Sequence, residues 1–149
     1  MTISKDVQLL LVEDSMDDAD LAMRAIKNAN VINDIVWLKD GEEAIHYLKG
    51  EGKYEGRDTS IKPRVILLDL KLPKIGGVQV LEKIKKDDNL KNIPVVVMTS
   101  SKENVDLKRC YELGVNSYVV KPISFSKFSK VIKDISLYWV LVNKIPEDS

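Results

Sequence analysis

The chain has 149 residues, of which 44% are hydrophobic and 31% are charged. That length fits one domain that can bury a single core without disulfides or metal ions to hold it together. The 23 basic residues balance the 23 acidic residues, which argues against bulk attraction to nucleic acid or to an anionic membrane. A single cysteine, the lack of a signal-peptide pattern and the lack of a membrane-length apolar stretch predict a cytoplasmic protein.

Short apolar runs alternate with amphipathic segments along the whole chain. The runs are typical of buried strands, and they occupy residues 9–12, 35–38, 65–68, 94–98 and 117–120. Apolar residues at helical spacing follow each run and predict helices over about residues 15–29, 40–48, 78–86, 104–113 and 124–142. This alternation predicts an α/β fold with a five-stranded parallel sheet flanked by five helices. We expect the doubly wound strand order 2-1-3-4-5 of flavodoxin-like proteins, in which the first and third strands are adjacent.

Chemically active residues stand where the predicted strands end. Glu13 and Asp14 follow the first run, and Asp69 follows the third. Thr99 follows the fourth run and Lys121 the fifth. Parallel strands end at one edge of a sheet, which is where ligands bind in this architecture. Carboxylates crowded there must stay protonated or bind a cation, and a hard divalent ion such as Mg²⁺ fits them.

Such an edge is suited to phosphoryl transfer. Asp69 would act as a nucleophile that forms an acyl phosphate. The Thr99 hydroxyl would donate a hydrogen bond to one phosphate oxygen, and the Lys121 ammonium would pair with another.

This ordered set of residues resembles the receiver domain of two-component response regulators. Pro73 and Gly77 match the loop after the phosphorylated aspartate in that family, and Tyr118 matches its aromatic switch position. The resemblance implies one receiver domain with its core over about residues 8–142 and a short tail, 143–149. The long polar loop over residues 50–62 and the extended last helix also resemble single-domain receivers partnered with bacterial phytochromes.

The resemblance assigns roles at the acidic edge. Asp69 would accept a phosphoryl group from a sensor histidine kinase, of the phytochrome type in the subgroup just mentioned. Glu13, Asp14 and Asp69 would bind Mg²⁺ as the cofactor. The backbone carbonyl of Lys71 would complete the metal ligands. The side chain of Lys71 would face the phosphoryl pocket, and its effect on dephosphorylation is left open.

The resemblance also implies a switch. Thr99 and Lys121 would hold the phosphoryl group. Thr99 would then move inward, and Tyr118 would turn inward behind it. The changed face would be formed by the fourth helix, the fifth strand and the fifth helix, and it would alter contacts with a partner or a second copy of the chain.

The last predicted helix is apolar on more than one side, which predicts a homodimer through that helix. The alternative is a longer helix that lies along the same core. Only seven residues follow it, so we expect a stand-alone receiver without an output domain. Its main apolar stripe is formed by Phe125, Phe128, Ile132, Ile135 and Trp139.

Two other functions fit an acidic edge of this kind. A small phosphatase or phosphotransferase with an aspartate nucleophile often carries a second aspartate two residues later, where this chain has Lys71. A flavin-binding module needs a phosphate-binding loop after the first strand, where Glu13 and Asp14 would repel the phosphate. The receiver therefore remains the preferred interpretation, without enzymatic turnover of a separate substrate.

Overall fold

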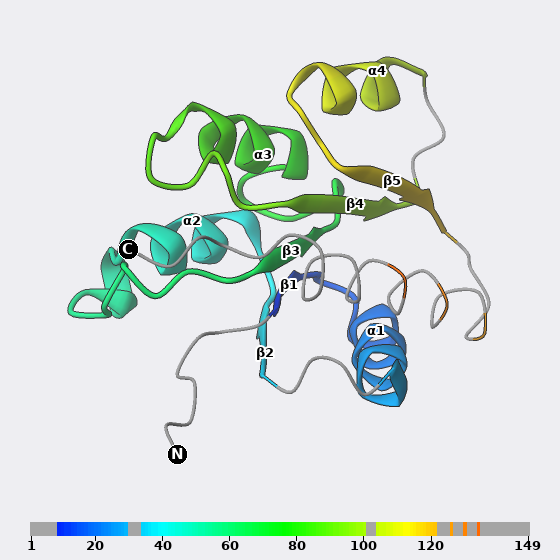
Figure 1. The fold of residues 1–149 in the computed structure, drawn as a ribbon, viewed down its shortest axis with the longest axis horizontal. Helices are drawn as coiled ribbons and strands as arrows, with labels where there is room; N and C mark the ends of the chain where they lie inside the picture. Colours follow the sequence, from blue (N-terminus) through cyan, green and yellow to red (C-terminus); the bar gives the residue numbers. More distant parts are fainter. Residues whose placement is uncertain are drawn as a thin grey trace.

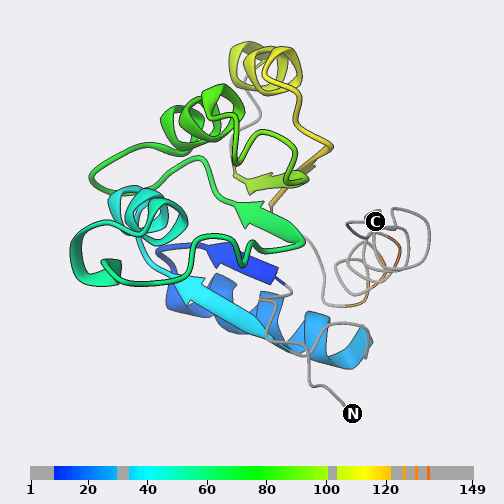
Figure 2. The same cartoon turned by 60° about the vertical axis from the view of Figure 1, so that its left-hand side comes forward.

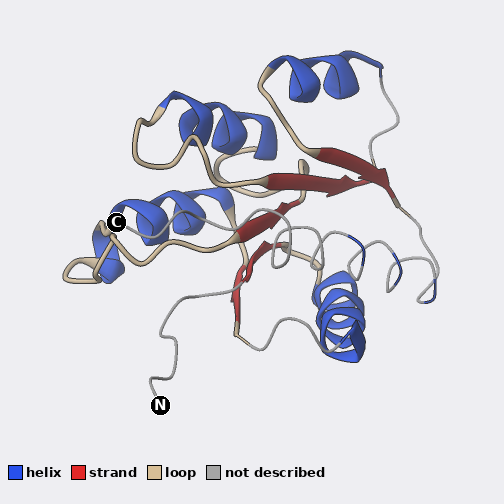
Figure 3. Ribbon diagram, viewed as in Figure 1, coloured by secondary structure: helices blue, strands red, loops and turns tan. Residues whose placement is uncertain are grey.

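The computed structural model describes residues 9–29, 34–100 and 104–121, with Ser126, Lys130 and Asp134 as single positions. Strands and helices alternate along this part of the chain (Figure 3). The strands are β1 (Leu9–Val12), β2 (Ile35–Leu38), β3 (Val65–Leu68), β4 (Val95–Thr99) and β5 (Ser117–Val120). The helices are α1 (Met16–Ala29), α2 (Gly41–Lys49), the short 3-10 helix η1 (Gly52–Tyr54), α3 (Gly77–Lys86) and α4 (Asn104–Glu112).

The five strands form one sheet in the order β2-β1-β3-β4-β5, and all four neighbouring pairs are parallel. This confirms the predicted sheet and its strand order. Four of the five predicted α-helices lie within the described residues. The fifth, over residues 124–142, falls outside them apart from the three single positions, as does the predicted tail. None of the described helices has the length and apolar character needed to cross a bilayer.

Helices cover both faces of the sheet, with α1 on one face and α2, α3 and α4 on the other (Figures 1 and 2). Alternate residues of a strand point to opposite faces, so β1 contributes to two separate cores. Leu9 and Leu11 pack with the alanines of α1, whereas Leu10 and Val12 pack with the cluster under α2 and α3. The continuous apolar runs in the sequence therefore reflect strands that are buried on both faces.

A glycine sets how closely α3 approaches the end of β3. A Cβ atom added to Gly77 would lie 2.2 Å from the carbonyl oxygen of Asp69. The N–H of Gly77 donates to the Leu70 carbonyl at 2.8 Å. The loop that follows Asp69 is thus closed tightly by the first residue of α3, and only a residue without a side chain fits there.

We predict that Gly77→Ala destabilises the protein by about 2 kcal/mol or more, because the new methyl group meets backbone atoms that cannot move without shifting β3 or α3. Urea unfolding measures the loss. The matched control is Gly76→Ala, where an added Cβ has no neighbour closer than 3.9 Å. Equal losses in the two variants would contradict this explanation.

Candidate functional site

The residues predicted at the strand ends do gather at one edge of the sheet. Val12 and Leu68 are paired in register, so the residues after them, Glu13 and Asp69, are neighbours. The N–H of Asp69 donates to the Val12 carbonyl at 3.0 Å. One carboxylate oxygen from each of Glu13, Asp14 and Asp69 lies within 4.8 Å of the other two. The sheet topology therefore forms the acidic group that the sequence predicted.

Glu13 is fully buried and held from several sides. One carboxylate oxygen contacts Lys121, and the other accepts the N–H of Ser15 at 3.2 Å. The carbonyl of Glu13 accepts the indole N–H of Trp37, on the neighbouring strand β2, at 2.8 Å. Burial raises the pKa of Glu13 to about 7, and the adjacent Asp69 adds to this rise against the opposing effect of Lys121.

Asp69 is also buried, and both of its carboxylate oxygens accept hydrogen bonds. Oδ1 accepts the backbone N–H of Lys71 at 3.2 Å, and Oδ2 accepts the Lys121 ammonium at 3.3 Å. Asp14, in contrast, is exposed. The acidic group therefore has a buried base formed by Glu13 and Asp69 and an open mouth at Asp14, through which a hydrated cation can enter.

Lys121 links the group together, because its ammonium contacts three carboxylates. The Nζ atom lies 2.5 Å from Glu13, 2.9 Å from Asp18 and 3.3 Å from Asp69. Burial alone would lower the pKa of Lys121, but the hydrogen bonds to Glu13 and Asp18 outweigh it and raise the pKa above its usual value. Lys121 therefore stays protonated and supplies a fixed positive charge beside Asp69.

Of the remaining predicted residues, Thr99 and Tyr118 lie on β4 and β5, and Lys71 lies in the loop after β3. Thr99 is the last residue of β4 and is fully buried, and its carbonyl accepts the N–H of Lys121 at 2.7 Å. Tyr118 lies on β5 in register with Val97 and packs, partly buried, against the core under α2, α3 and α4. Lys71 is exposed, and its N–H is bound to Asp69. Thr99 is thus at the edge itself, whereas Tyr118 lies on the next strand, beside a residue two positions before Thr99.

Two participants were not predicted from the sequence. Asp18, in the first turn of α1, resembles the many acids that favour a helix N-terminus. Trp37 resembles an ordinary strand aromatic. Their contacts with Lys121 and Glu13 join residues that are 103 and 24 positions apart in the chain, and no local pattern encodes such a pairing.

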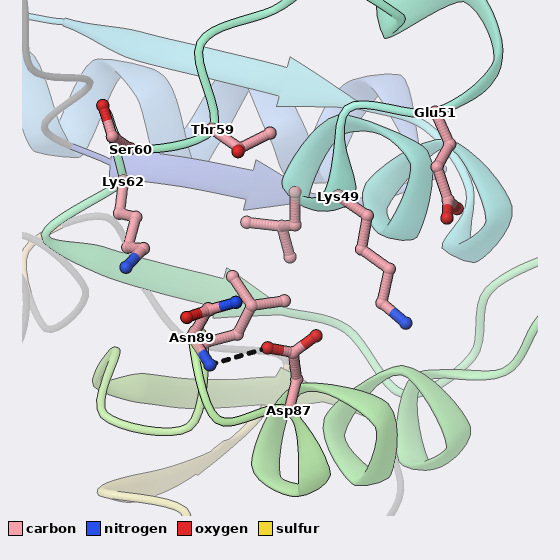
Figure 4. Close-up of a pocket in the computed structure, with 9 residues that line it drawn as sticks. Lys49, Glu51, Thr59, Ser60, Lys62, Asp87 and Asn89 are labelled. Carbon is pink, nitrogen blue, oxygen red and sulfur yellow. Dashed lines mark hydrogen bonds between the residues drawn. The ribbon is translucent and has the colours of Figure 1, made fainter.

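A cleft of about 480 Å³ lies at the opposite edge of the sheet, where α2 and α3 end and β3 and β4 begin (Figure 4). Lysines and acids both line it, and the Asp87 carboxylate accepts the N–H of Asn89 at 2.7 Å. Its lining includes none of the residues of the acidic edge. Labelled in Figure 4 are Lys49, Glu51, Thr59, Ser60, Lys62, Asp87 and Asn89.

Comparison with known proteins identifies the family. Residues 9–133 match the model of the response regulator receiver domain. The chain therefore belongs to the response regulator receiver family, which carries two-component signals.

Several relatives match over nearly their whole length. The probable methanogenesis regulatory protein FilR2 of Methanothrix harundinacea is 44% identical over 138 residues, which are 93% of this chain and 86% of FilR2. Response regulator Rcp1 of Synechocystis is 38% identical over 93% of this chain and 92% of its own. The crystal structure of the phosphorylated cyanobacterial phytochrome response regulator RcpA has a TM-score of 0.83 and 38% identity over 95% of this chain and 99% of RcpA.

These relatives bear on the chemistry of the acidic edge. A solved structure of Rcp1, with a TM-score of 0.80 and 38% identity over 93% of this chain and 97% of its own, is described as Mn²⁺-bound. Receiver domains bind a divalent metal at an acidic pocket, and Glu13, Asp14 and Asp69 form an acidic group here whose oxygens lie close enough together to hold one. The relatives are signalling receivers, so a phosphoacceptor role is supported and the phosphatase alternative is not favoured.

We predict that the fluorescence of Trp37 reports metal binding, because its indole N–H donates a hydrogen bond to the backbone carbonyl of Glu13, a candidate metal ligand. In a Trp139→Phe variant, Trp37 is the only remaining tryptophan, and titration with Mn²⁺ or Mg²⁺ should change its emission. Asp14→Asn should weaken the metal affinity by about tenfold or more. The control is Asp20→Asn, which removes an exposed charge that is paired with Arg24. An unchanged affinity in Asp14→Asn would exclude this metal site.

Proposed function

We propose that this chain is a phosphorelay receiver that accepts a phosphoryl group on Asp69 in a Mg²⁺-dependent step. The proposal rests on the observation that both carboxylate oxygens of the buried Asp69 accept hydrogen bonds. Asp69 Oδ1 is tied to the N–H of Lys71 and Oδ2 to the ammonium of Lys121. A carboxylate held at both oxygens keeps one orientation, and it lies within 4.8 Å of the exposed Asp14 carboxylate at the open mouth of the acidic group.

The metal and the phosphoryl group would divide the edge between them. Glu13, Asp14 and Asp69 would hold Mg²⁺, with the carbonyl of Lys71 as a further ligand. A bound Mg²⁺ supplies positive charge that offsets the carboxylates and the incoming phosphoryl oxygens. Lys121 would pair with one phosphoryl oxygen, and the Thr99 hydroxyl would donate to another.

The transfer itself exchanges one bond to phosphorus for another. A carboxylate oxygen of Asp69 attacks the phosphorus of a phosphohistidine, and an oxygen–phosphorus bond forms. The phosphorus–nitrogen bond breaks, and the imidazole nitrogen keeps the electron pair. The charge of Lys121, together with that of a metal held by the acidic group, would stabilise the transferring group, so the main contributions of the chain would be positioning and charge neutralisation.

The donor in this proposal is a sensor histidine kinase of the phytochrome type, and the receiver works in the cytoplasm. The donor class is supported by relatives described as phytochrome or bacteriophytochrome response regulators, at 38% to 45% identity. The functional unit is a single receiver domain over about residues 8–142, with residues 143–149 as a tail.

The output in this proposal is a changed face around α4, β5 and the predicted last helix. Thr99 and Tyr118 act as the switch, since Thr99 ends the strand beside Asp69 and Tyr118 lies on the next strand. Apolar side chains on this face are exposed: Val105 by 75%, Tyr111 by 52% and Val120 by 37%. Exposed apolar surface of this kind favours a partner, and we propose that the partner is a second copy of the chain.

For the central step, we predict that the wild-type protein with Mg²⁺ and acetyl phosphate gains one phosphoryl group that is lost in base, and that Asp69→Asn gains none. Intact mass spectrometry measures the gain. Omission of Mg²⁺ should also abolish it. Wild type that stays unmodified, or Asp69→Asn that is modified equally, would disprove the proposal, and sustained hydrolysis of many donors per protein would favour a phosphatase instead.

For the output, we predict a dimer in sedimentation velocity that strengthens when beryllium fluoride and Mg²⁺ mimic the phosphorylated state. The physical reason is that apolar surface on the face around α4 and β5 becomes buried between two copies. Tyr111→Glu, which places a charge on that face, should weaken the dimer. A monomer at high concentration with and without the analogue would exclude the dimer.

A further inference from the structure

We propose that Asp18 is a positioning residue that holds Lys121 at the phosphoryl pocket while the metal is bound. The inference rests on the proposed function, because it takes Lys121 as the group that pairs with the phosphoryl oxygens. The contact is direct: Asp18 Oδ2 lies 2.9 Å from the Lys121 ammonium, closer than the 3.3 Å that separates the ammonium from Asp69.

Asp18 differs from the other two carboxylates that contact Lys121. It stands outside the acidic group whose oxygens lie close enough to share a cation, which consists of Glu13, Asp14 and Asp69. Its side chain is 42% exposed, whereas those of Glu13 and Asp69 are 0% and 7% exposed. Asp18 thus approaches the ammonium from the open side of the pocket, and the other two approach it from the buried base.

The local fold keeps Asp18 in this position. It lies in the first turn of α1, directly after the loop that carries the metal-ligand candidates. The backbone N–H of Asp18 donates to the Ser15 hydroxyl oxygen at 3.3 Å, and the N–H of Ser15 donates to Glu13. The turn that presents Asp18 is therefore connected by hydrogen bonds to the same segment that presents Glu13.

The contact between Asp18 and Lys121 matters most for the position of the ammonium when a metal is bound. A divalent cation held by Glu13, Asp14 and Asp69 would repel the Lys121 ammonium, and it would bind two of the three carboxylates that contact the ammonium. The contact with Asp18 is the one of the three that the cation does not use. The Lys121 side chain is only 12% exposed, so its ammonium needs a partner where it lies. If the metal took Glu13 and Asp69 and Asp18 were absent, the ammonium would be left unpaired and would rotate toward solvent.

The donor count of the lysine permits this role in the phosphorylated state as well. An ammonium has three N–H donors. One donor would remain on Asp18, and two would be released for phosphoryl oxygens as Glu13 is engaged by the metal and Asp69 by the new acyl phosphate bond. The negative charge of Asp18 repels the phosphoryl group only weakly, because water and salt screen an exposed carboxylate.

The test compares two neighbouring aspartates of the same helical turn. Asp18→Asn removes one charged partner of Lys121. Asp17→Asn removes the same charge at an exposed position, and Asp17 is not among the carboxylates that contact Lys121 in the described part of the chain. Trp37 fluorescence in the Trp139→Phe background measures Mg²⁺ affinity and, at saturating Mg²⁺, the affinity for beryllium fluoride. Circular dichroism verifies that each variant is folded.

We expect Asp18→Asn to weaken beryllium fluoride binding about fivefold while Mg²⁺ affinity changes less than about twofold. Asp17→Asn should leave both affinities within about twofold. In a Lys121→Gln background, Asp18→Asn should add no further loss, since the interaction it removes is already absent.

Equal losses in the two aspartate variants would overturn the inference, because they would show a bulk charge effect. Tighter analogue binding in Asp18→Asn would also overturn it, by showing that Asp18 competes with the phosphoryl group for the lysine. Failure of the wild-type protein to bind beryllium fluoride at saturating Mg²⁺ is a separate result: it would contradict the proposed function itself.

Discussion

The crowding of negative charge at one edge of a parallel sheet is the constraint on which the site depends. Parallel strands end at the same edge of the sheet. Glu13 and Asp69 directly follow paired residues of β1 and β3, so their carboxylates are forced close together. Burial makes this proximity costly, as the pKa of Glu13 at about 7 shows. The Lys121 ammonium offsets part of the charge through three contacts. A divalent cation would balance the negative charge that remains.

Much of the surrounding fold serves to hold this edge in place. Trp37, on an outer strand, is bonded to the backbone of Glu13, and Ser15 connects Glu13 to the first turn of α1. On the other side, Gly77 allows α3 to begin against the carbonyl of Asp69. Gly41 allows the loop after Asp69 to rest on α2, since an added Cβ would lie 2.0 Å from the Ile75 carbonyl oxygen. Stability and site geometry therefore share the same contacts.

The fold and most of the site follow from local patterns, whereas the supporting contacts do not. Continuous apolar runs predicted all five strands, and polar residues at their ends predicted the acidic edge, because both depend on neighbours in sequence. The role of Asp18 and the conformation of the long loop before β3 depend instead on tertiary contacts. The loop appeared only as a polar stretch, yet Arg57 lies 4.0 Å from the Tyr47 ring and donates to the Tyr47 carbonyl at 2.8 Å. The short helix η1 within it was likewise not predicted.

The most direct test of the central claim is a crystal structure of the protein with Mn²⁺ and beryllium fluoride, in which anomalous scattering locates the metal. Our account predicts Mn²⁺ bound by Glu13, Asp14 and Asp69, beryllium joined to an Asp69 oxygen, and the Lys121 ammonium within hydrogen-bond distance of a fluoride. Metal bound elsewhere, or beryllium fluoride away from Asp69, would contradict it.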